Sequence, residues 1–258
     1  MSYRVRRILH RVTRSIFWLT PVMAIFAAGC STSSAGAFDY ECPNGKIVLF
    51  SLLDLSSSGR TDDILAERLN AIQVDAERVA DCEGTLVVTG WSLSSAASTT
   101  LFQGDLATTG ATEIGRDRKI ERVVSETMDS IRDALPDAFA KIDPKGSSLS
   151  GAFALAADRN LSLKDGEYLE IRIYGDAIST VGPDSINDPS ITLDDVNTIV
   201  GSLAPVDLNG VNVTMVGVGK SGGIVQPPQD YINIVRAYAD AVCRHTGAVC
   251  TTLTSITN

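Results

Sequence analysis

The feature that most constrains this chain is the apolar run from Ile47 to Leu53, which only Ser51 interrupts. A nearly continuous apolar run of this length is typical of a central parallel strand with helices over both of its faces. The run therefore predicts an α/β fold with this strand near the middle of the sheet.

A polar loop, Asp54-Leu-Ser56-Ser-Ser58, follows the run directly. One carboxylate and two hydroxyls with this spacing offer three hard oxygens to a single point, which suits Mg²⁺ or Mn²⁺ better than zinc. Asp and Ser are also common turn residues, so the loop is equally compatible with Asp54 as the cap of the next helix. The pentapeptide alone leaves both interpretations open.

The first 29 residues have the pattern of an export signal. Five arginines and no acidic residue come first, and Ile16 to Ala28 is then an apolar run too short to span a bilayer comfortably. The run leads into Ala27-Ala-Gly-Cys30, which resembles the lipobox of bacterial lipoproteins, whose cysteine becomes the lipid-modified first residue. We expect a signal peptide over residues 1–29, lipid attachment at Cys30 and a tether over residues 30–45. The alternative is ordinary secretion with cleavage near Ala28.

Net charge argues against a nucleic-acid partner, and chain length is compatible with one domain. Removal of the leader takes away five of the 22 basic residues and none of the 31 acidic ones, which leaves a net charge of −14. A chain this acidic repels phosphate backbones, so no nucleic-acid partner is expected. The remaining residues suffice for one α/β domain with a full core, assigned to residues 46–258.

Hydrophobic periodicity predicts helices and strands that alternate along most of the domain. The second predicted helix is expected to kink or end at Pro136, because proline lacks the backbone N–H that the helix requires. The predicted strands are residues 46–53, 85–91, 100–106, 168–174, 211–218 and 249–256, and the predicted helices are 61–80, 116–135, 152–160, 192–203 and 230–245. This order indicates a doubly wound, mostly parallel six-stranded sheet with one antiparallel edge strand.

The chain resembles the von Willebrand factor A (vWA) domain over roughly residues 46–256, because three separated motifs follow that family's order. Asp54-Leu-Ser56-Ser-Ser58 is similar to the Asp-x-Ser-x-Ser of the metal-ion-dependent adhesion site. Gly146-Ser147-Ser-Leu is similar to the segment that carries the metal-binding threonine, and Ile173-Tyr-Gly-Asp176 to the segment that carries the second carboxylate. The resemblance implies a divalent-metal site made of Asp54, Ser56, Ser58, Ser147 and Asp176.

The predicted topology leads to the same edge of the sheet. In an open sheet of order 3-2-1-4-5-6, the winding reverses between strands one and four, and ligands bind at the carboxyl ends of those two strands. Asp54 and Asp176 are the acidic residues at these two ends. Two neighbouring carboxylates repel each other unless a cation lies between them. Asp176 also fits a simple turn residue at a strand end.

Four cysteines remain in the predicted domain, and four cysteines allow three pairings. Cys42 and Cys82 each precede one of two adjacent parallel strands, while Cys243 ends the last helix and Cys250 begins the last strand. We therefore predict the disulfides Cys42–Cys82 and Cys243–Cys250, in the oxidising compartment that export implies. Four free buried thiols are the alternative.

Three functions are compatible with these features. The first is a lipid-anchored, extracytoplasmic binding module whose metal accepts a carboxylate from a protein partner. The second is a metal-dependent hydrolase that activates water between the two carboxylates. The third is a metal-free envelope scaffold. Catalysis by a Ser–His pair is not expected, because His10 lies in the leader and His245 at the far end of the last helix.

Overall fold

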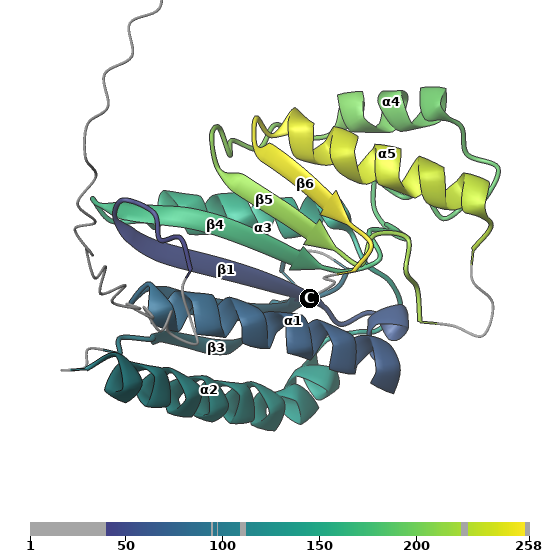
Figure 1. Ribbon diagram of the computed structural model, residues 1–258. Coiled ribbons are helices and arrows are strands. Elements are labelled where there is room, and N and C mark those ends of the chain that lie inside the picture. Colours follow the sequence, from purple (N-terminus) through teal and green to yellow (C-terminus); the bar gives the residue numbers. More distant parts are fainter. Residues whose placement is uncertain (1–39, 94, 97, 109–111, 223–226, 256–258) are drawn as a thin grey trace, which may run out of the picture. The chain divides into compact units, whose positions relative to one another are not determined.

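A six-stranded sheet with β1 (Lys46–Asp54) among its central strands organises the computed structural model (Figure 1). The structure describes residues 40–93, 95–96, 98–108, 112–222 and 227–255, so the predicted signal peptide and Cys30 lie outside the described residues. The strand order is β3-β2-β1-β4-β5-β6, and every neighbouring pair is parallel except β2 and β3. The predicted doubly wound α/β sheet with one antiparallel edge strand is confirmed, and the strand order is the predicted 3-2-1-4-5-6.

The other elements alternate along the chain in the predicted order, with ends within two residues of those expected in all but three elements. Helix α2 begins three residues early and extends six residues beyond its predicted end, α3 begins three residues early, and β6 ends three residues early. The strands are β2 Thr85–Trp91, β3 Ser98–Asp105, β4 Glu167–Tyr174, β5 Asn212–Val216 and β6 Val249–Leu253. The helices are α1 Asp62–Asp81, α2 Glu113–Lys141, α3 Leu149–Leu161, α4 Leu193–Ser202 and α5 Gln229–His245, with a single 3₁₀ turn at Ser57–Gly59.

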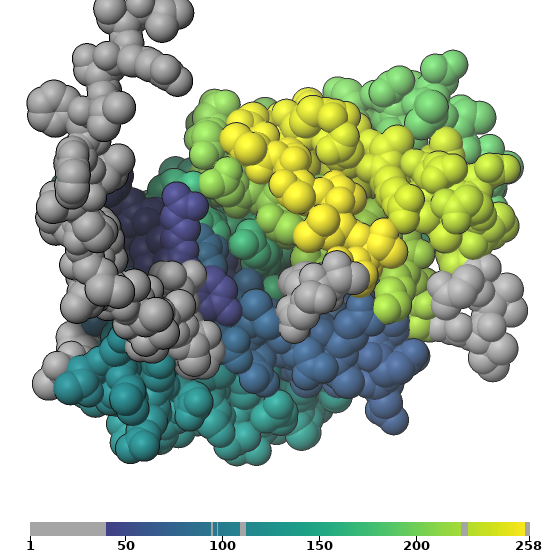
Figure 2. Space-filling view, viewed as in Figure 1, coloured from purple at the N-terminus to yellow at the C-terminus, as the bar shows by residue number. Residues whose placement is uncertain are grey.

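Helices cover both faces of the sheet, and strand β1 contributes to both cores. Leu49 and Leu53 pack with α1 and α2, whereas Phe50 and Leu52 point to the core formed with α3 and α5. These four side chains are at most 5% exposed. In Figure 2 the α1–α2 layer forms the lower part of the visible surface and the α4–α5 layer the upper part. Burial on both faces explains why the strand lacks polar alternation.

The sequence predicts a kink or an end of α2 at Pro136, and an end there is wrong, because the helix runs through the proline to Lys141. Proline removes one hydrogen bond, that to the carbonyl of Arg132, one turn earlier. Arg132 lies on the exposed side of the helix, where water can satisfy that carbonyl. Leu135 and Ala138, on either side of the proline, are both buried in the core with α1 and β2. The free energy gained by packing Leu135 and Ala138 therefore outweighs the loss of one backbone hydrogen bond at Pro136.

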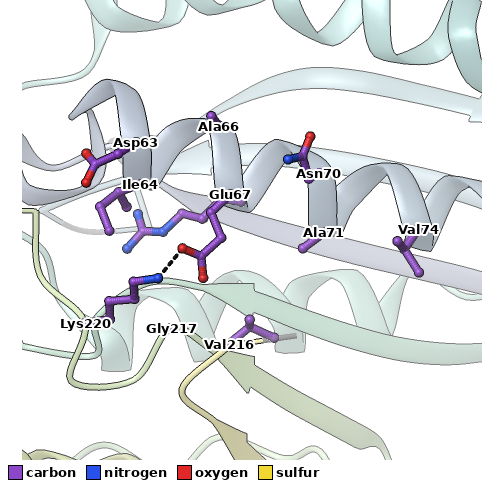
Figure 3. A pocket seen from close by; sticks show the side chains of 11 residues that line it. Asp63, Ile64, Ala66, Glu67, Asn70, Ala71, Val74, Val216, Gly217 and Lys220 are labelled. Atoms are coloured by element: carbon purple, nitrogen blue, oxygen red, sulfur yellow. Dashed lines mark hydrogen bonds and ion pairs between the residues drawn. The ribbon is translucent and has the colours of Figure 1, made fainter. Parts of the chain in front are cut away.

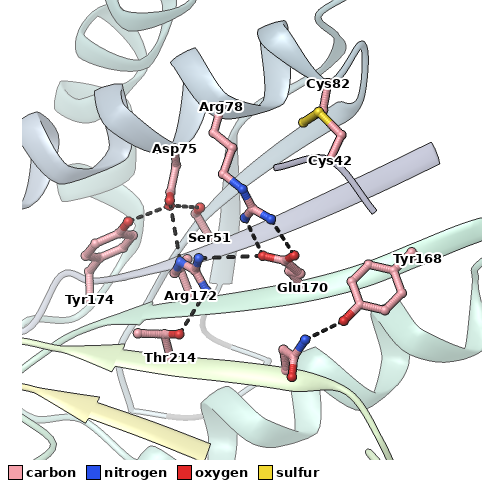
Figure 4. Close-up of polar contacts among 11 residues, drawn as sticks. Cys42, Ser51, Asp75, Arg78, Cys82, Tyr168, Glu170, Arg172, Tyr174 and Thr214 are labelled. Carbon is pink, nitrogen blue, oxygen red and sulfur yellow. Dashed lines mark hydrogen bonds and ion pairs between the residues drawn. A yellow bond between two sulfur atoms is a disulfide. The ribbon is translucent and has the colours of Figure 1, made fainter. Parts of the chain in front are cut away.

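Strand β4 carries charged residues that its central position does not favour, and the structure pairs them (Figure 4). Glu170 accepts two hydrogen bonds from Arg78 of α1 and lies 3.5 Å from Arg172. Arg172 also lies 3.5 Å from Asp75, which accepts a hydrogen bond from Tyr174. Burial raises the pKa of Asp75, whereas Arg78 outweighs burial and lowers the pKa of Glu170. The buried charges of β4 are thus paired with each other and with charged side chains of α1.

Both predicted disulfides are confirmed. Cys42 is bonded to Cys82 at the end of α1, and Cys243 of α5 is bonded to Cys250 of β6. The backbone N–H of Tyr40 donates to Asp81, so the described chain before β1 is fastened to the end of α1 at two points. No helix of the described residues is long and apolar enough to cross a membrane.

Candidate metal centre

The two carboxylates predicted to face each other are held at the ends of neighbouring strands. Asp54 is the last residue of β1 and Asp176 follows β4 by two residues, and they are 1% and 2% exposed. Asp54 Oδ1 accepts the backbone N–H of Ser56 at 2.8 Å, and Asp176 Oδ1 accepts that of Ile178 at 3.0 Å. Each carboxylate therefore has one oxygen fixed by its own loop. Asp54 does not cap the next helix, because Thr61 occupies that position.

The serine hydroxyls of the first motif join this pair. Ser58 Oγ donates to Asp176 Oδ2 at 2.8 Å, and Ser56 Oγ lies 3.2 Å from Ser58 Oγ. The loop after β1 is thus connected to the loop after β4, across 118 positions of sequence. Ser57 turns away and donates to the carbonyl of Pro144 at 2.7 Å. In the Asp-x-Ser-x-Ser motif, Ser56 and Ser58 therefore lie beside the carboxylates, whereas Ser57 anchors the loop to Pro144.

Ser147 lies at the same edge, but its hydroxyl points to a backbone carbonyl in this structure. Ser147 Oγ donates to the carbonyl of Ile178 at 3.1 Å, and its backbone exchanges hydrogen bonds with Thr180. Ser56, Ser58, Ser147 and Asp176 all line one open cavity of about 490 Å³, and Ser147 also lines a small cavity beside Asp54. Ser147 thus lines both the cavity that Asp176 lines and the cavity that Asp54 lines.

Gly175 and Ala177 flank Asp176, and both occupy constrained positions. A Cβ at position 175 would lie 3.2 Å from Asp54 Cβ and from the Trp91 ring, so a larger residue would need these neighbours to move by a few tenths of an ångström. Ala177 adopts a φ of 60°, the left-handed region that favours glycine. Trp91 is buried and donates from its indole nitrogen to the carbonyl of Ser148, so it belongs to the core.

The electrostatics of the pair favour a bound cation. Burial, together with the charge of Asp176, raises the pKa of Asp54 to about 6, against the lowering effects of Arg68 and of the hydrogen bonds from Ser56. Two buried carboxylates that repel each other, with hydroxyls beside them, form a set of hard oxygen donors. This set fits Mg²⁺ or Mn²⁺, and five protein oxygens would leave at least one position of an octahedral ion open.

Among the described residues, one group of three or more acidic, His or Cys side chains has the spacing of metal ligands. It consists of Cys42, Asp81 and Cys82. Its two sulfur atoms are joined in a disulfide, so neither is available as a thiolate ligand. This group therefore does not compete with the Asp54–Asp176 pair as a metal centre.

Sequence reasoning missed Arg68, which lies behind Asp54. Its side chain is 4% exposed, and Nη1 donates to the backbone carbonyl of Asp54 at 3.0 Å. Arg68 is also the strongest influence that lowers the pKa of Asp54. The sequence pattern could have predicted that Arg68 is buried, because it lies at helical spacing from Ile64, Ala71 and Asp75 on the buried face of α1.

Sequence reasoning also missed Asp184, a fully buried carboxylate in the loop after β4. Asp184 Oδ2 accepts hydrogen bonds from Ser150 N at 2.9 Å, Ser179 Oγ at 2.9 Å and Tyr238 OH at 2.8 Å. Ser148 Oγ donates to its other oxygen at 3.1 Å. A carboxylate at the N-terminus of α3 is also favoured by the helix dipole. Asp184 therefore fastens the start of α3, and with it Ser147, to the loop that carries Asp176.

Comparison with known proteins adds little beyond the fold. No protein-family model matches the chain, and no curated protein sequence matches it significantly. A similar solved structure is that of the conserved hypothetical protein BatB from Bacteroides thetaiotaomicron, with 13% identity, a TM-score of 0.39, and coverage of 82% of this chain and 92% of that chain. The pilus adhesin SpaC from Lactobacillus rhamnosus GG, in its open conformation, has 11% identity and a TM-score of 0.41, with coverage of 80% of this chain and 30% of that chain.

Proposed function

We propose that this protein is a lipid-anchored, extracytoplasmic binding module that engages an acidic group of a protein partner through a divalent cation. The observation that carries the proposal is the convergence of Asp176 and three hydroxyls on one open cavity, with Asp54 in the wall of a small cavity that Ser147 also lines, where β1 and β4 end. Asp54, Ser56, Ser58, Ser147 and Asp176 would hold Mg²⁺ or Mn²⁺ there. When bound, the ion offers an open coordination position to a carboxylate of the partner.

The surroundings of the site support binding over hydrolysis. The cavity of about 490 Å³ is walled by prolines, among them Pro144, Pro189 and Pro228, and by Tyr231 at the start of α5. His245 ends the same helix, about 24 Å along its axis from Gln229, so it cannot serve as a base at this site. The described residues therefore place no histidine at the cavity.

Two observations support the proposed location. Two disulfides are the pattern of a protein that folds in an oxidising compartment. The basic leader and the Ala-Ala-Gly-Cys30 sequence favour export and lipid attachment. In a bacterium that processes lipoproteins, the mature chain should begin at Cys30 and partition into detergent, and Cys30→Ala should remain unprocessed. A mature chain with another first residue would exclude the anchor.

Calorimetry of Mg²⁺ and Mn²⁺ binding to the wild type and to Asp54→Ala tests the metal site. We expect binding only to the wild type, and no change for Asp158→Ala, which removes an equal charge from the exposed side of α3. Capture of envelope proteins with and without EDTA then tests the role of the ion. Absence of heat at millimolar metal, or equal capture in EDTA, would favour the metal-free scaffold. Turnover of phosphoesters would favour the hydrolase.

A further inference from the structure

Strand β6 forms one edge of the sheet, and within the described residues no strand lies beyond it (Figure 1). The N–H of Val249 and the C=O of Leu253 bond to the β5 segment. Successive residues of a strand direct their backbone groups to opposite sides. The N–H and C=O groups of Cys250 and Thr252 therefore point to the free edge, where they can bond to another strand.

One face of this edge strand is open to solvent. Val249 is 57% exposed and Leu253 37%, and Thr251 between them is exposed as well. Figure 3 shows Val216 of β5, the neighbour of Leu253 in register, opposite α1 across an open cavity of about 440 Å³. No side chain of β6 belongs to the core formed with α1 and α2. The strand thus exposes two large apolar side chains next to unpaired backbone groups.

The two edge strands of the sheet differ in their protection against pairing. Exposed edges are usually blunted by charged residues, prolines or bulges. In β3, at the other edge, the pairing with β2 is interrupted by a register shift, and Asp105 forms an ion pair with Lys46. In contrast, β6 contains no charged residue, no proline and no glycine, and its register with β5 is unbroken. The β6 edge is therefore suited to pair with a further strand.

The pattern of β6 is complementary to itself. In antiparallel pairing about a two-fold axis at Thr251, Cys250 of one copy exchanges both backbone hydrogen bonds with Thr252 of the other. Val249 then lies opposite Leu253 of the second copy, and Leu253 opposite its Val249. The exposed apolar side chains cover each other in both copies, and such cross-strand pairs stabilise a sheet. This match favours a second copy over an unrelated strand.

We propose that β6 pairs with β6 of a second copy of this chain, in antiparallel register about Thr251, so that two sheets join into one. Local charge permits the approach: Arg236 of α5 donates to Thr254 after β6, and Asp240 and Arg244 follow at one-turn intervals on the same side of α5. The contact between two five-residue strands is small, so the dimer is weak. The proposal depends neither on metal binding nor on lipid attachment.

Disulfide formation between introduced cysteines tests the register. Thr251→Cys places two thiols at a non-hydrogen-bonded antiparallel pair, whose Cα atoms lie about 4.5 Å apart, within the range of disulfides. Val249→Cys leaves its two thiols at least about 13 Å apart, because they are four residues out of register. In exported full-length protein oxidised with glutathione disulfide, we expect Thr251→Cys to form a linked dimer at least about tenfold faster than Val249→Cys. The wild type, which keeps Cys30, gives the background.

The double variant Val249→Cys/Leu253→Cys should link as fast as Thr251→Cys, since it places one cysteine of each copy opposite the other. Sedimentation in EDTA over a range of concentrations measures association directly. Thr251→Lys should weaken the dimer at least about tenfold, because two like charges then meet at the axis. Thr100→Lys, the same change at an exposed site of β3, should have no effect.

Equal rates of linkage for Thr251→Cys and Val249→Cys overturn the proposal. Equal average mass of wild type and Thr251→Lys at every concentration also overturns it. Thr251 is exposed, and circular dichroism confirms that each variant is folded. Because EDTA is present in the sedimentation assay, failure of the metal site leaves its result unchanged.

Discussion

Replacement of Asp54 by asparagine should stabilise the protein when no metal is present. The pKa of the buried Asp54 carboxyl is raised from 3.8 to about 6, so its ionised form is disfavoured in the folded state. A difference of about two pKa units corresponds to roughly 3 kcal/mol at a pH above both values. The asparagine side chain would keep an oxygen for the Ser56 N–H and would carry no charge. We therefore expect the free energy of unfolding at pH 8 in EDTA to rise by up to about 3 kcal/mol.

The dependence on pH follows from the raised pKa. Below pH 3.8 the carboxyl is protonated in both the folded and the unfolded state, so wild type and Asp54→Asn should be about equally stable. As the pH rises toward and through 6, the wild type loses stability relative to the variant, because the unfolded chain ionises more readily. Urea unfolding of both proteins in EDTA, at steps between pH 4 and 8, measures this difference.

Added Mg²⁺ should reverse the order. At a metal concentration about 1,000 times the Kd, the wild type gains about 4.1 kcal/mol, which exceeds the advantage of the variant, and the variant gains little. Asp158→Asn removes an exposed charge and should follow the wild type throughout. A wild type and variant that differ by the same amount at every pH would refute the reasoning, because the effect would then not arise from the charge of Asp54.

Three further predictions concern other parts of the molecule. Ser147→Thr should retain or improve Mg²⁺ affinity in calorimetry, since it keeps the hydroxyl and restricts its rotamers; a large loss would mean that the added methyl group does not fit beside Ile178. Loss of Cys42–Cys82 by double Ser substitution should cost about 4 kcal/mol in urea unfolding and loss of Cys243–Cys250 about 2.5 kcal/mol, because the first bond closes the longer loop; the reverse order would contradict the entropic argument. Glu170→Ala should cost about 3–5 kcal/mol by leaving Arg78 and Arg172 without their shared carboxylate, and a loss under about 1 kcal/mol would show that water reaches these charges.

Local patterns in the sequence were sufficient for the fold class. The apolar run of β1 reflects burial on both faces, and the amphipathic periods of α1 and α5 each predict one packed side. Topology rules then placed Asp54 beside Asp176, and the same strand order paired Cys42 with Cys82. These inferences succeeded because each depends on a short segment and on one general rule of chain geometry.

Only the tertiary structure decided the features that depend on several distant segments at once. Helix α2 continues past Pro136 because Leu135 and Ala138 are both packed, which a local rule for proline does not include. Arg68 and Asp184 act on the candidate metal centre from a helix and a loop that carry no motif. The balance of burial, neighbouring charge and hydrogen bonds that raises the pKa of Asp54 involves residues from three elements or loops. Such balances arise only when the chain is packed, because desolvation and Coulomb energy depend on distance in space and not on separation in sequence.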